Sequence, residues 1–465
     1  MRLNIVLHSA YRLIQSYLCV VVILYVLTLS YREVNVDAAY YLGVVDSIYD
    51  GLIPIRDFQL GYTPLSFYLM LIVRVFTHNF TAYLLIMLLM LVFASYILYK
   101  IVFKLTDNKS LSLLSAILLL IQSYLFEGTY FVLEPITIFF GLLSVYCLFA
   151  AELTPKNILL SGLFAGAAFM SKQYGLAYLA GNMIFLVLVH GSYSEKIKRL
   201  FYTGIGFIII PLIFVVYFMF NGLSISETIT AFMGGGYGKR EATFWKEGIY
   251  ALFNIRYFLT IFLIAIPYVV YKNRRLIPIT IALITIVFLL TFQFYFQLFD
   301  HYYILIFPFI LILFTLISKV NYKAVGYALV VIMVLSSLYL GKKMVRDTVH
   351  VVKSNPKEVQ LAELNDIEKL INEHDVIYSL SVKYVSYYYL LNIKPPLFEK
   401  YGFSFGNETP YEMIEKINNA TVLLVDNNFS DDLLNVKDYV SKNGFESIYI
   451  GENLTILRNT KKNLH

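Results

Sequence analysis

Long apolar segments recur along most of the chain, and no water-soluble core could bury so many of them. About eleven of these runs have roughly the length of a membrane-spanning helix, and short polar turns separate them. Only 15% of the residues are charged, against about a quarter in soluble domains. We therefore expect an α-helical polytopic membrane protein. The expected spans lie at about residues 11–30, 80–104, 111–126, 133–151, 158–171, 174–191, 199–220, 250–271, 276–297, 302–318 and 323–341.

The remaining composition narrows the function classes. No small-residue cleavage site follows the first apolar run, so we expect it to stay as an uncleaved transmembrane helix. Both cysteines, Cys19 and Cys147, lie inside apolar runs, which argues against a disulfide framework. The net charge of +6 is small for 465 residues and does not indicate nucleic-acid binding.

Basic residues in the connecting loops set the expected orientation. If the N-terminus is cytoplasmic, the inside loops hold about fourteen Lys and Arg residues, roughly twice as many as the outside loops. An odd number of spans then places the segment after Gly341 outside. We expect a multi-pass protein of the cell (plasma) membrane with two domains. Residues 1–344 form the transmembrane domain, with an outside loop at 31–79, and residues 345–465 form a small extracytoplasmic α/β domain.

The outside loop at 31–79 is long enough to hold two short helices. In "DAAYYLGVVDSIYD", the acids Asp46 and Asp50 fall opposite an apolar face, a pattern that favours a helix lying in the membrane interface. In "YTPLSFYLMLIVRVF", Thr63 is the expected N-cap and Pro64 the first helical residue, while Arg74 interrupts the run. The predicted apolar face of the first helix contains Ala38, Tyr41, Leu42, Val45, Ile48 and Tyr49.

The C-terminal region has the pattern of a small α/β domain. "DVIYSLS" and "TVLLVD" are predicted to be strands, and "ESIYI…LTILRN" a hairpin that turns at Gly451. "DDLLNVKDYVSKNG" is predicted to be a helix that ends at Gly444.

Single ionisable residues stand at the outside ends of several predicted helices. A charge inside apolar sequence is costly unless it is paired or lies in a wet cavity, so each one is a candidate functional group. The topology places all of them at the same level of the bilayer, where they can converge. These residues are Asp37, Asp57, Glu134, Lys172, Asp300 and His301.

Each candidate also has a purely structural interpretation. Asp37 is either a solvated cap of its helix or a general base or metal or phosphate-network ligand. Asp57 follows Arg56, which can simply pair with it. Glu134 precedes Pro135 at a helix start, where a carboxylate also suits the helix dipole. Lys172 either binds a phosphate or extends to lipid headgroups.

Other motifs give weaker signals. His301 in "FDHYYILIFP" is either a hydrogen-bonded anchor or a member of a site. "MGGGYGKRE" at 233–241 fails as a nucleotide-binding loop, because Met233 stands where a P-loop needs glycine and Arg240 follows the lysine. It is expected to be a flexible outside loop. No zinc-protease, CxxC, GxSxG or kinase signature occurs in the sequence.

Several of these segments together resemble the GT-C superfamily of polytopic membrane glycosyltransferases. The resemblance is to the bacterial branch related to protein O-mannosyltransferases and the lipid A aminoarabinose transferase. It rests first on "NVDAAYYLGVVDSIYDGLIPIRDFQLGYTPLSFYLM", which looks like the first outside loop of the family. "LEPITIFFGLLSVYCLF", "LLSGLFAGAAFMSKQYGL" and "HYYILIFPFILIL" look like later recurring segments. The resemblance covers residues 10–320, approximately.

The resemblance implies a fold, a reaction and roles for named residues. Such enzymes transfer a sugar, with inversion, from a polyprenyl-phosphate carrier to an acceptor hydroxyl of an envelope lipid, glycan or protein outside the cytoplasmic membrane. Asp37 would be the base that deprotonates the acceptor. Lys172 and Arg56 would hold the donor phosphate. The remaining substrate-binding candidates are Asp57, Tyr62, Glu134, His301 and Tyr302.

The sequence departs from some relatives at one position and leaves alternatives open. Ala38 follows Asp37 where some relatives carry a second acid, which weakens a protein O-mannosylation function. No cofactor is certain; a divalent metal stays open, because branches of the superfamily differ. A transporter or flippase of lipid-linked saccharides is the alternative function, although no paired halves or broken helices of the kind inverted repeats leave are evident. An assembly scaffold would leave the charged helix ends unexplained.

Overall fold

The computed structural model describes most of the chain. It covers residues 2–58, 60–233, 274–293, 300–319, 323–372, 374–380, 386–391, 410–426, 440, 442–450 and 454–461. The predicted span at 250–271, residues 234–241 of the glycine-rich segment and most of the helix predicted to end at Gly444 lie outside the described residues.

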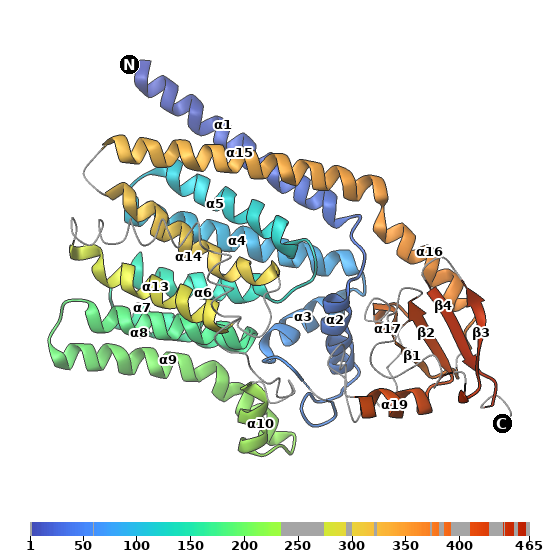
Figure 1. Ribbon diagram of the computed structural model, residues 1–465. Helices are drawn as coiled ribbons and strands as arrows, with labels where there is room; N and C mark the ends of the chain where they lie inside the picture. Colours follow the sequence, from blue (N-terminus) through green and yellow to red (C-terminus); the bar gives the residue numbers. More distant parts are fainter. Residues whose placement is uncertain are drawn as a thin grey trace.

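The described helices up to Ser354 form a bundle, with α1 and α15 running side by side along one flank (Figure 1). The short helices α2 and α3 lie at one end of the bundle, and the C-terminal domain lies beside them (Figure 1). The helices and turns are α1 (Arg2–Leu29), α2 (Val36–Tyr49), α3 (Leu65–Phe76), α4 (Phe80–Thr106), α5 (Lys109–Ser123), η1 (Tyr124–Gly128), α6 (Glu134–Phe149), α7 (Pro155–Ser171), η2 (Gln173–Gly175), α8 (Leu176–Leu188), α9 (Tyr193–Phe220), α10 (Ile225–Phe232), η3 (Arg274–Leu276), α13 (Ile277–Gln293), η5 (Asp300–Tyr302), α14 (Tyr303–Leu316), η6 (Ile317–Lys319) and α15 (Lys323–Ser354).

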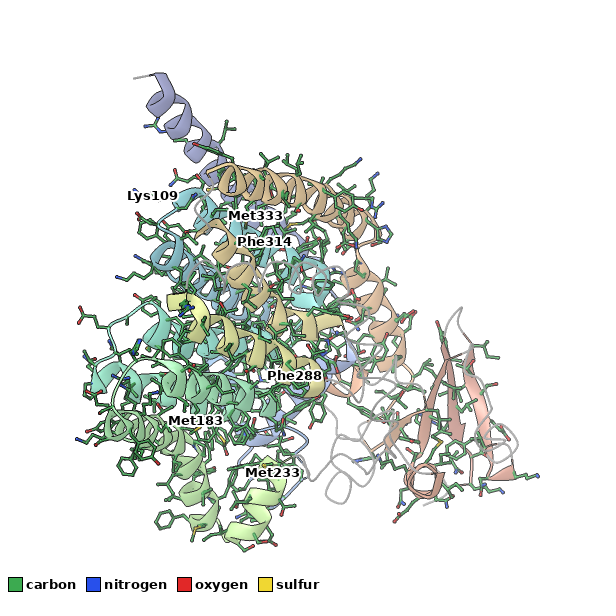
Figure 2. All side chains as sticks on the ribbon, turned by 60° about the vertical axis from the view of Figure 1, so that its left-hand side comes forward. Lys109, Met183, Met233, Phe288, Phe314 and Met333 are labelled. Atoms are coloured by element: carbon green, nitrogen blue, oxygen red, sulfur yellow. The ribbon has the colours of Figure 1, made fainter. Side chains whose placement is uncertain are left out.

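Five described helical stretches are long and apolar enough to cross a membrane, which makes the chain a helical membrane protein. Each predicted span other than 250–271 coincides with a described helix, whereas the count of eleven stays a prediction. Large apolar side chains such as Phe288 on α13 project from the bundle, as expected for a lipid-facing surface (Figure 2). The five stretches are Arg12–Leu29, Phe80–Thr106, Lys109–Gly128, Tyr193–Phe220 and Tyr327–Glu368.

The two short helices predicted for the loop at 31–79 are present, but α2 is packed on more sides than an interfacial helix would be. Val44 and Ala39, which fall outside the predicted apolar face, are both buried, while Tyr49 within that face is exposed. The difference arises because α2 packs against α3 and against α17 (Ser386–Leu390) of the C-terminal domain. Sequence periodicity could not reveal that second neighbour.

Helix α3 also begins differently from the prediction. Pro64 is its N-cap, and Thr63 does not cap the helix; its hydroxyl instead donates to the Phe169 carbonyl oxygen at the end of α7. Arg74 does not break the helix, because its guanidinium pairs with Asp46 of α2 and lies over the ring of Tyr49. Arg74, which interrupts the apolar run in the sequence, thus forms a contact between α2 and α3.

The C-terminal domain contains a four-stranded sheet in the order β1-β2-β4-β3. The two single strands and the hairpin predicted from the sequence are all present. Helix α15 continues through the expected domain boundary at 344–345 to Ser354. The elements are α16 (Pro356–Glu368), β1 (Ile377–Ser379), α17, α19 (Pro410–Asn419), β2 (Val422–Asp426), β3 (Phe445–Ile450) and β4 (Leu454–Asn459), with β1 parallel to β2 and the other pairs antiparallel.

Candidate active site

A break between α7 and α8 positions Lys172. The residue has an extended backbone (φ −160°, ψ 138°), and the short turn η2 follows it. Gly175 lets this turn fold back on α7: a Cβ atom there would lie 2.2 Å from the Ala168 carbonyl carbon, much closer than any side chain tolerates. The tight turn directs the lysine into the bundle instead of toward lipid.

The ammonium of Lys172 forms an ion pair with the Glu134 carboxylate, and both side chains are fully buried. Glu134 is the first residue of α6, where the helix dipole favours a negative charge. Its Oε1 atom accepts from Lys172 Nζ, whereas Oε2 is buried and has no hydrogen-bond partner among the described residues. A buried carboxylate oxygen without a donor is costly, and such costs concentrate at functional sites.

Three tyrosine rings surround the ammonium. The Lys172 Nζ atom lies 4.9 Å from the ring centroid of Tyr62, 4.8 Å from that of Tyr302 and 5.5 Å from that of Tyr174. Cations are attracted to the faces of aromatic rings, most strongly where water is excluded. The rings come from the loop between α2 and α3, from η5 and from η2, so the lysine joins three separate segments of the chain.

His301 connects this pair to a second acid. Its Nδ1 atom lies 2.7 Å from Glu127 Oε2, and its Nε2 atom lies 3.8 Å from Glu134 Oε1. Glu127 adopts a left-handed backbone (φ 61°) inside η1, which is unusual for a residue with a side chain. Lys172, Glu134, His301 and Glu127 therefore form one charged cluster, here called the Lys172 cluster.

Asp37 lies in the first turn of α2 and is partly exposed. The side chain of Asn35 caps this helix by accepting from the Ala38 backbone amide at 2.9 Å, so Asp37 is not needed as the cap. Burial raises the pKa of Asp37, while positive charge at His301 and Lys172 acts to lower it. The carboxyl therefore lies within electrostatic reach of the Lys172 cluster.

Aromatic contacts join α2 to the tyrosines around Lys172. The ring of Tyr62 packs against those of Tyr40 and Tyr41, with centroid distances of 6.1 and 5.6 Å. The Tyr40 hydroxyl accepts from the Gly61 backbone amide at 3.1 Å, and burial raises the pKa of Tyr40 to about 12. These ring contacts connect α2, which carries Asp37, to Tyr62, whose ring lies beside the Lys172 ammonium.

The structure does not bring Arg56 and Asp57 into this cluster. The Arg56 guanidinium binds the Asp57 carboxylate through two nitrogens, at 2.8 and 2.7 Å, and reaches the Asn221 carbonyl oxygen at 3.4 Å. These hydrogen bonds from Arg56 lower the pKa of Asp57. Arg56 is exposed and Asp57 partly exposed, and their pairing agrees with the purely structural interpretation of these two residues.

Two members of the site are absent from the set predicted from the sequence. Glu127 meets the criterion that singles out the other acids, since it is a lone charge in "SYLFEGTY". Tyr174 carries no sequence signal beyond following Lys172 by two residues. Within the described residues, no group of three or more His, Cys, Asp or Glu side chains is placed to hold a metal ion.

Comparison with known proteins agrees with the fold. A family model described as dolichyl-phosphate-mannose-protein mannosyltransferase matches residues 62–218, less than half of the chain. No curated protein sequence matches the chain at a significant level. The matched region contains Tyr62, Glu134 and Lys172 and ends before His301.

Two solved structures of ArnT from Cupriavidus metallidurans share the architecture over nearly the whole chain. The apo structure has a TM-score of 0.65 at 10% sequence identity, covering 97% of this chain and 98% of that one. The structure bound to undecaprenyl phosphate has a TM-score of 0.61 at 11% identity, covering 97% and 99%. These matches confirm the polytopic helical fold that the sequence predicted.

Proposed function

We propose that this chain is an inverting membrane glycosyltransferase that moves a sugar from a polyprenyl-phosphate donor to an acceptor hydroxyl at the outer face of the membrane. The observation that carries the proposal is the Lys172 cluster, in which a buried cation, two acids and a histidine converge. The partly exposed Asp37 lies within electrostatic reach of this cluster. The shared fold supports the reaction class, and the ArnT structure that contains undecaprenyl phosphate supports the type of carrier.

Asp37 is assigned as the general base. It accepts the proton of the acceptor hydroxyl while the hydroxyl oxygen attacks the anomeric carbon of the donor sugar from the face opposite the phosphate. The bond between the anomeric carbon and the phosphate oxygen breaks, and the polyprenyl phosphate leaves with both electrons of that bond. Partial exposure suits this role because the acceptor must reach the carboxylate.

Lys172 is assigned to the leaving phosphate. A lysine ammonium has three N–H donors, and the described hydrogen bonds use one of them, toward Glu134. Positive charge held where negative charge develops is the form of electrostatic stabilisation that enzymes use most effectively. The exposed Arg56 is already held through two hydrogen bonds by Asp57, so Lys172 is the better candidate for this role.

Glu134 and His301 position that lysine. The carboxylate fixes the ammonium, and the histidine, held by Glu127 on its other nitrogen, sets the environment of the carboxylate. Tyr62 and Tyr302 exclude water from the ammonium until the substrate phosphate moves one of the rings aside. Glu127 acts through His301, and the ring of Tyr174 lies beside the Lys172 ammonium. Both residues therefore join the candidate site residues that the sequence indicated.

The proposal is tested with the variant Asp37→Asn, reconstituted in vesicles with a polyprenyl-phosphate sugar and envelope acceptors. We expect normal insertion and folding, but transfer reduced about 10²-fold or more, because an amide cannot take the proton. Asp50→Asn is the matched control, since Asp50 is exposed at the other end of the same helix. Full transfer by Asp37→Asn would exclude Asp37 as the base, and translocation of the donor without any product would contradict the enzyme itself.

A further inference from the structure

The segment that leads into α2 is held by contacts from several other parts of the chain. It comprises residues 30–35, between the end of α1 and the start of α2, and is here called the entry segment. Asp37 lies two residues beyond it, in the first turn of α2. Because Asp37 is so close to the start of its helix, the position of its carboxylate depends on how the entry segment is held.

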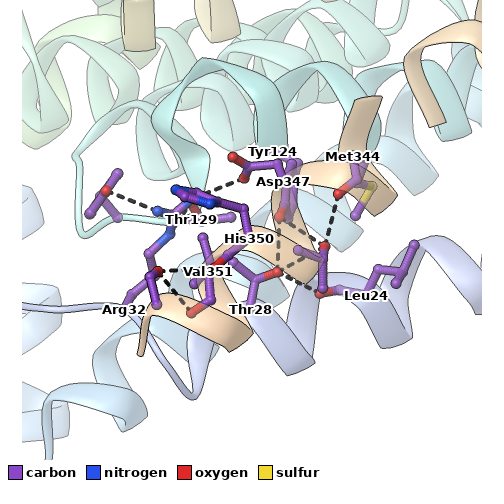
Figure 3. A network of polar contacts seen from close by, with 12 residues as sticks. Leu24, Thr28, Arg32, Tyr124, Thr129, Met344, Asp347, His350 and Val351 are labelled. Atoms are coloured by element: carbon purple, nitrogen blue, oxygen red, sulfur yellow. Dashed lines mark hydrogen bonds and ion pairs between the residues drawn. The ribbon is translucent and has the colours of Figure 1, made fainter. Parts of the chain in front are cut away.

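Arg32 joins the first half of the entry segment to the helix bundle. Its guanidinium lies 3.3 Å from the carboxylate of Asp347 on α15 and 3.1 Å from Thr129 Oγ1 (Figure 3). It also donates to the Tyr130 hydroxyl at 3.0 Å, and that hydroxyl donates to Glu33 Oε1 at 3.3 Å. These contacts fix the first half of the entry segment against α15 and against the loop that precedes α6.

The second half of the entry segment is bound by Gln360, which lies on α16 of the C-terminal domain. The Val34 backbone amide donates to Gln360 Oε1 at 2.9 Å, and Gln360 Nε2 donates to the Val34 carbonyl oxygen at 2.9 Å. One side-chain amide thus binds both peptide groups of a single residue, as a neighbouring strand does in a sheet. The Val34 side chain is buried in the core of the bundle. Buried peptide groups need partners inside the protein, and Gln360 supplies one to each group.

Two more hydrogen bonds place α16 beside the entry segment and α2. The backbone amide of Lys357, in the first turn of α16, donates to the Tyr31 carbonyl oxygen at 3.2 Å. The first amides of a helix have no acceptor within it, so this bond also satisfies a donor that α16 leaves open. Gln360 Nε2 donates in addition to Ser386 Oγ at 3.3 Å, at the start of α17, and α17 packs against α2.

The contacts at Val34 continue directly into the first turn of α2. Asn35, the next residue, caps the helix with its side chain and accepts from the Ala39 backbone amide at 2.9 Å. Only Asn35 and Val36 separate Val34 from Asp37, so a displacement of Val34 moves the carboxylate as well. A general base must lie within hydrogen-bond reach of the proton that it accepts. A displacement of about 1 Å is enough to slow such a reaction strongly.

We propose that Gln360 is a positioning residue for the transfer: through its two hydrogen bonds to Val34, the C-terminal domain fixes the place of Asp37 relative to the Lys172 cluster. Gln360 acts through the backbone of the entry segment and not on the reacting atoms. The effect on transfer rests on the proposed function, whereas the restraint on the entry segment does not. The C-terminal domain thereby has a definite task, which is to hold the start of the helix that carries the base.

The variant Gln360→Met tests the proposal in the purified full chain. Methionine has a similar length but cannot make the two hydrogen bonds to Val34. With the donor and acceptors used for Asp37→Asn, we expect kcat to fall about tenfold or more, because the base is no longer held in place. KM for the donor should stay unchanged, because the Lys172 cluster is untouched. Backbone hydrogen exchange in peptides that cover residues 31–40, followed by mass spectrometry, should become roughly threefold or more faster.

A second variant and a matched control separate positioning from stability. Gln360→Asn keeps the amide but is one methylene shorter, so it should behave like Gln360→Met, and it decides the test if Gln360→Met does not melt cooperatively. Tyr389→Phe is the control, because it removes another hydrogen bond between the C-terminal domain and the bundle, from the Tyr389 hydroxyl to the His78 carbonyl oxygen at 3.3 Å. In this control, kcat and the exchange over residues 31–40 should both stay unchanged.

The other outcomes would overturn the proposal. Faster exchange with unchanged kcat would show that the restraint on the entry segment does not position the base. A lower kcat with unchanged exchange would show that Gln360 does not act through that segment. Equal losses in Gln360→Met and Tyr389→Phe would indicate general docking of the domain in place of a positioning residue. If the original protein forms no product, the proposed function fails together with the effect on transfer, while faster exchange in Gln360→Met still confirms the restraint.

Discussion

Removal of Lys172 alone should destabilise the protein more than removal of both members of its ion pair. In Lys172→Met, a side chain of similar length keeps the packing among the tyrosine rings, but the Glu134 carboxylate loses its counterion. The imidazole of His301 remains beside it, with its Nε2 atom 3.8 Å from Glu134 Oε1. An acid that is fully buried would then have to stay charged without a partner, or bind a proton.

The expected magnitudes follow from that burial. Leaving one buried charge unpaired costs about 3–5 kcal/mol of the free energy of unfolding, whereas replacing both charges by apolar groups is often close to neutral. We therefore expect Lys172→Met to be destabilised by about 3–5 kcal/mol, and Lys172→Met/Glu134→Leu to regain most of that loss. Glu134→Leu alone should also be destabilised, because it leaves the ammonium unpaired among the rings.

Unfolding of the purified proteins by increasing SDS in mixed micelles, followed by circular dichroism, measures these differences. The three variants and the original protein form a double-mutant cycle, which isolates the interaction between the two side chains. If the double variant is as unstable as the sum of the two single variants, the pair does not interact as described. Transfer should be lost in all three variants, because each removes either Lys172 or the carboxylate that positions it. The double variant regains stability but not the charge near the phosphate.

Three further predictions concern Asp37, the proposed base, and the loop at 31–79. Asp37 accepts a proton only when it is ionised, and burial raises its pKa above the ordinary 3.8. As the pH is lowered, Asp37 therefore becomes protonated at a higher pH than an exposed aspartate does. The rate of transfer should begin to fall at that higher pH. His301→Gln removes a charge that lowers this pKa, so the acid limb of the pH–rate profile should move to still higher pH; an unmoved limb would contradict the electrostatic coupling. Arg74→Met should lower the free energy of unfolding by about 2 kcal/mol, because Asp46 loses its partner. KM for the donor should stay unchanged in this variant. An altered KM would mean that the contact between α2 and α3 shapes the site.

The sequence was most informative where the signal is local. The apolar runs predicted where the described helices lie, because a membrane helix must satisfy its backbone hydrogen bonds internally and present apolar side chains to lipid. The ends were less well predicted, since α15 continues to Ser354, beyond the predicted end at 341. The hairpin of β3 and β4 was predicted because its alternating pattern and turn lie in one short segment. Thr63 was misassigned because α3 begins one residue later than predicted, with Pro64 as its N-cap, and because the Thr63 hydroxyl donates to the Phe169 carbonyl oxygen of α7, a neighbour that the sequence does not reveal.

The site was only half visible in the sequence. Isolated charges in apolar segments pointed to Asp37, Glu134, Lys172 and His301, since such residues are too costly to place in a membrane protein without a reason. The same argument could not separate them from Asp57, whose charge is neutralised by its neighbour Arg56.

The sequence by itself determined that the chain is a helical membrane protein with charges gathered at one end of its helices, because hydrophobic periodicity and charge cost are properties of each segment. Only the tertiary structure decided which charges meet. Lys172 pairs with an acid 38 residues away, and His301 with one 174 residues away. Those contacts depend on how helices pack, and the energy of a buried charge is set by the partner it finds there.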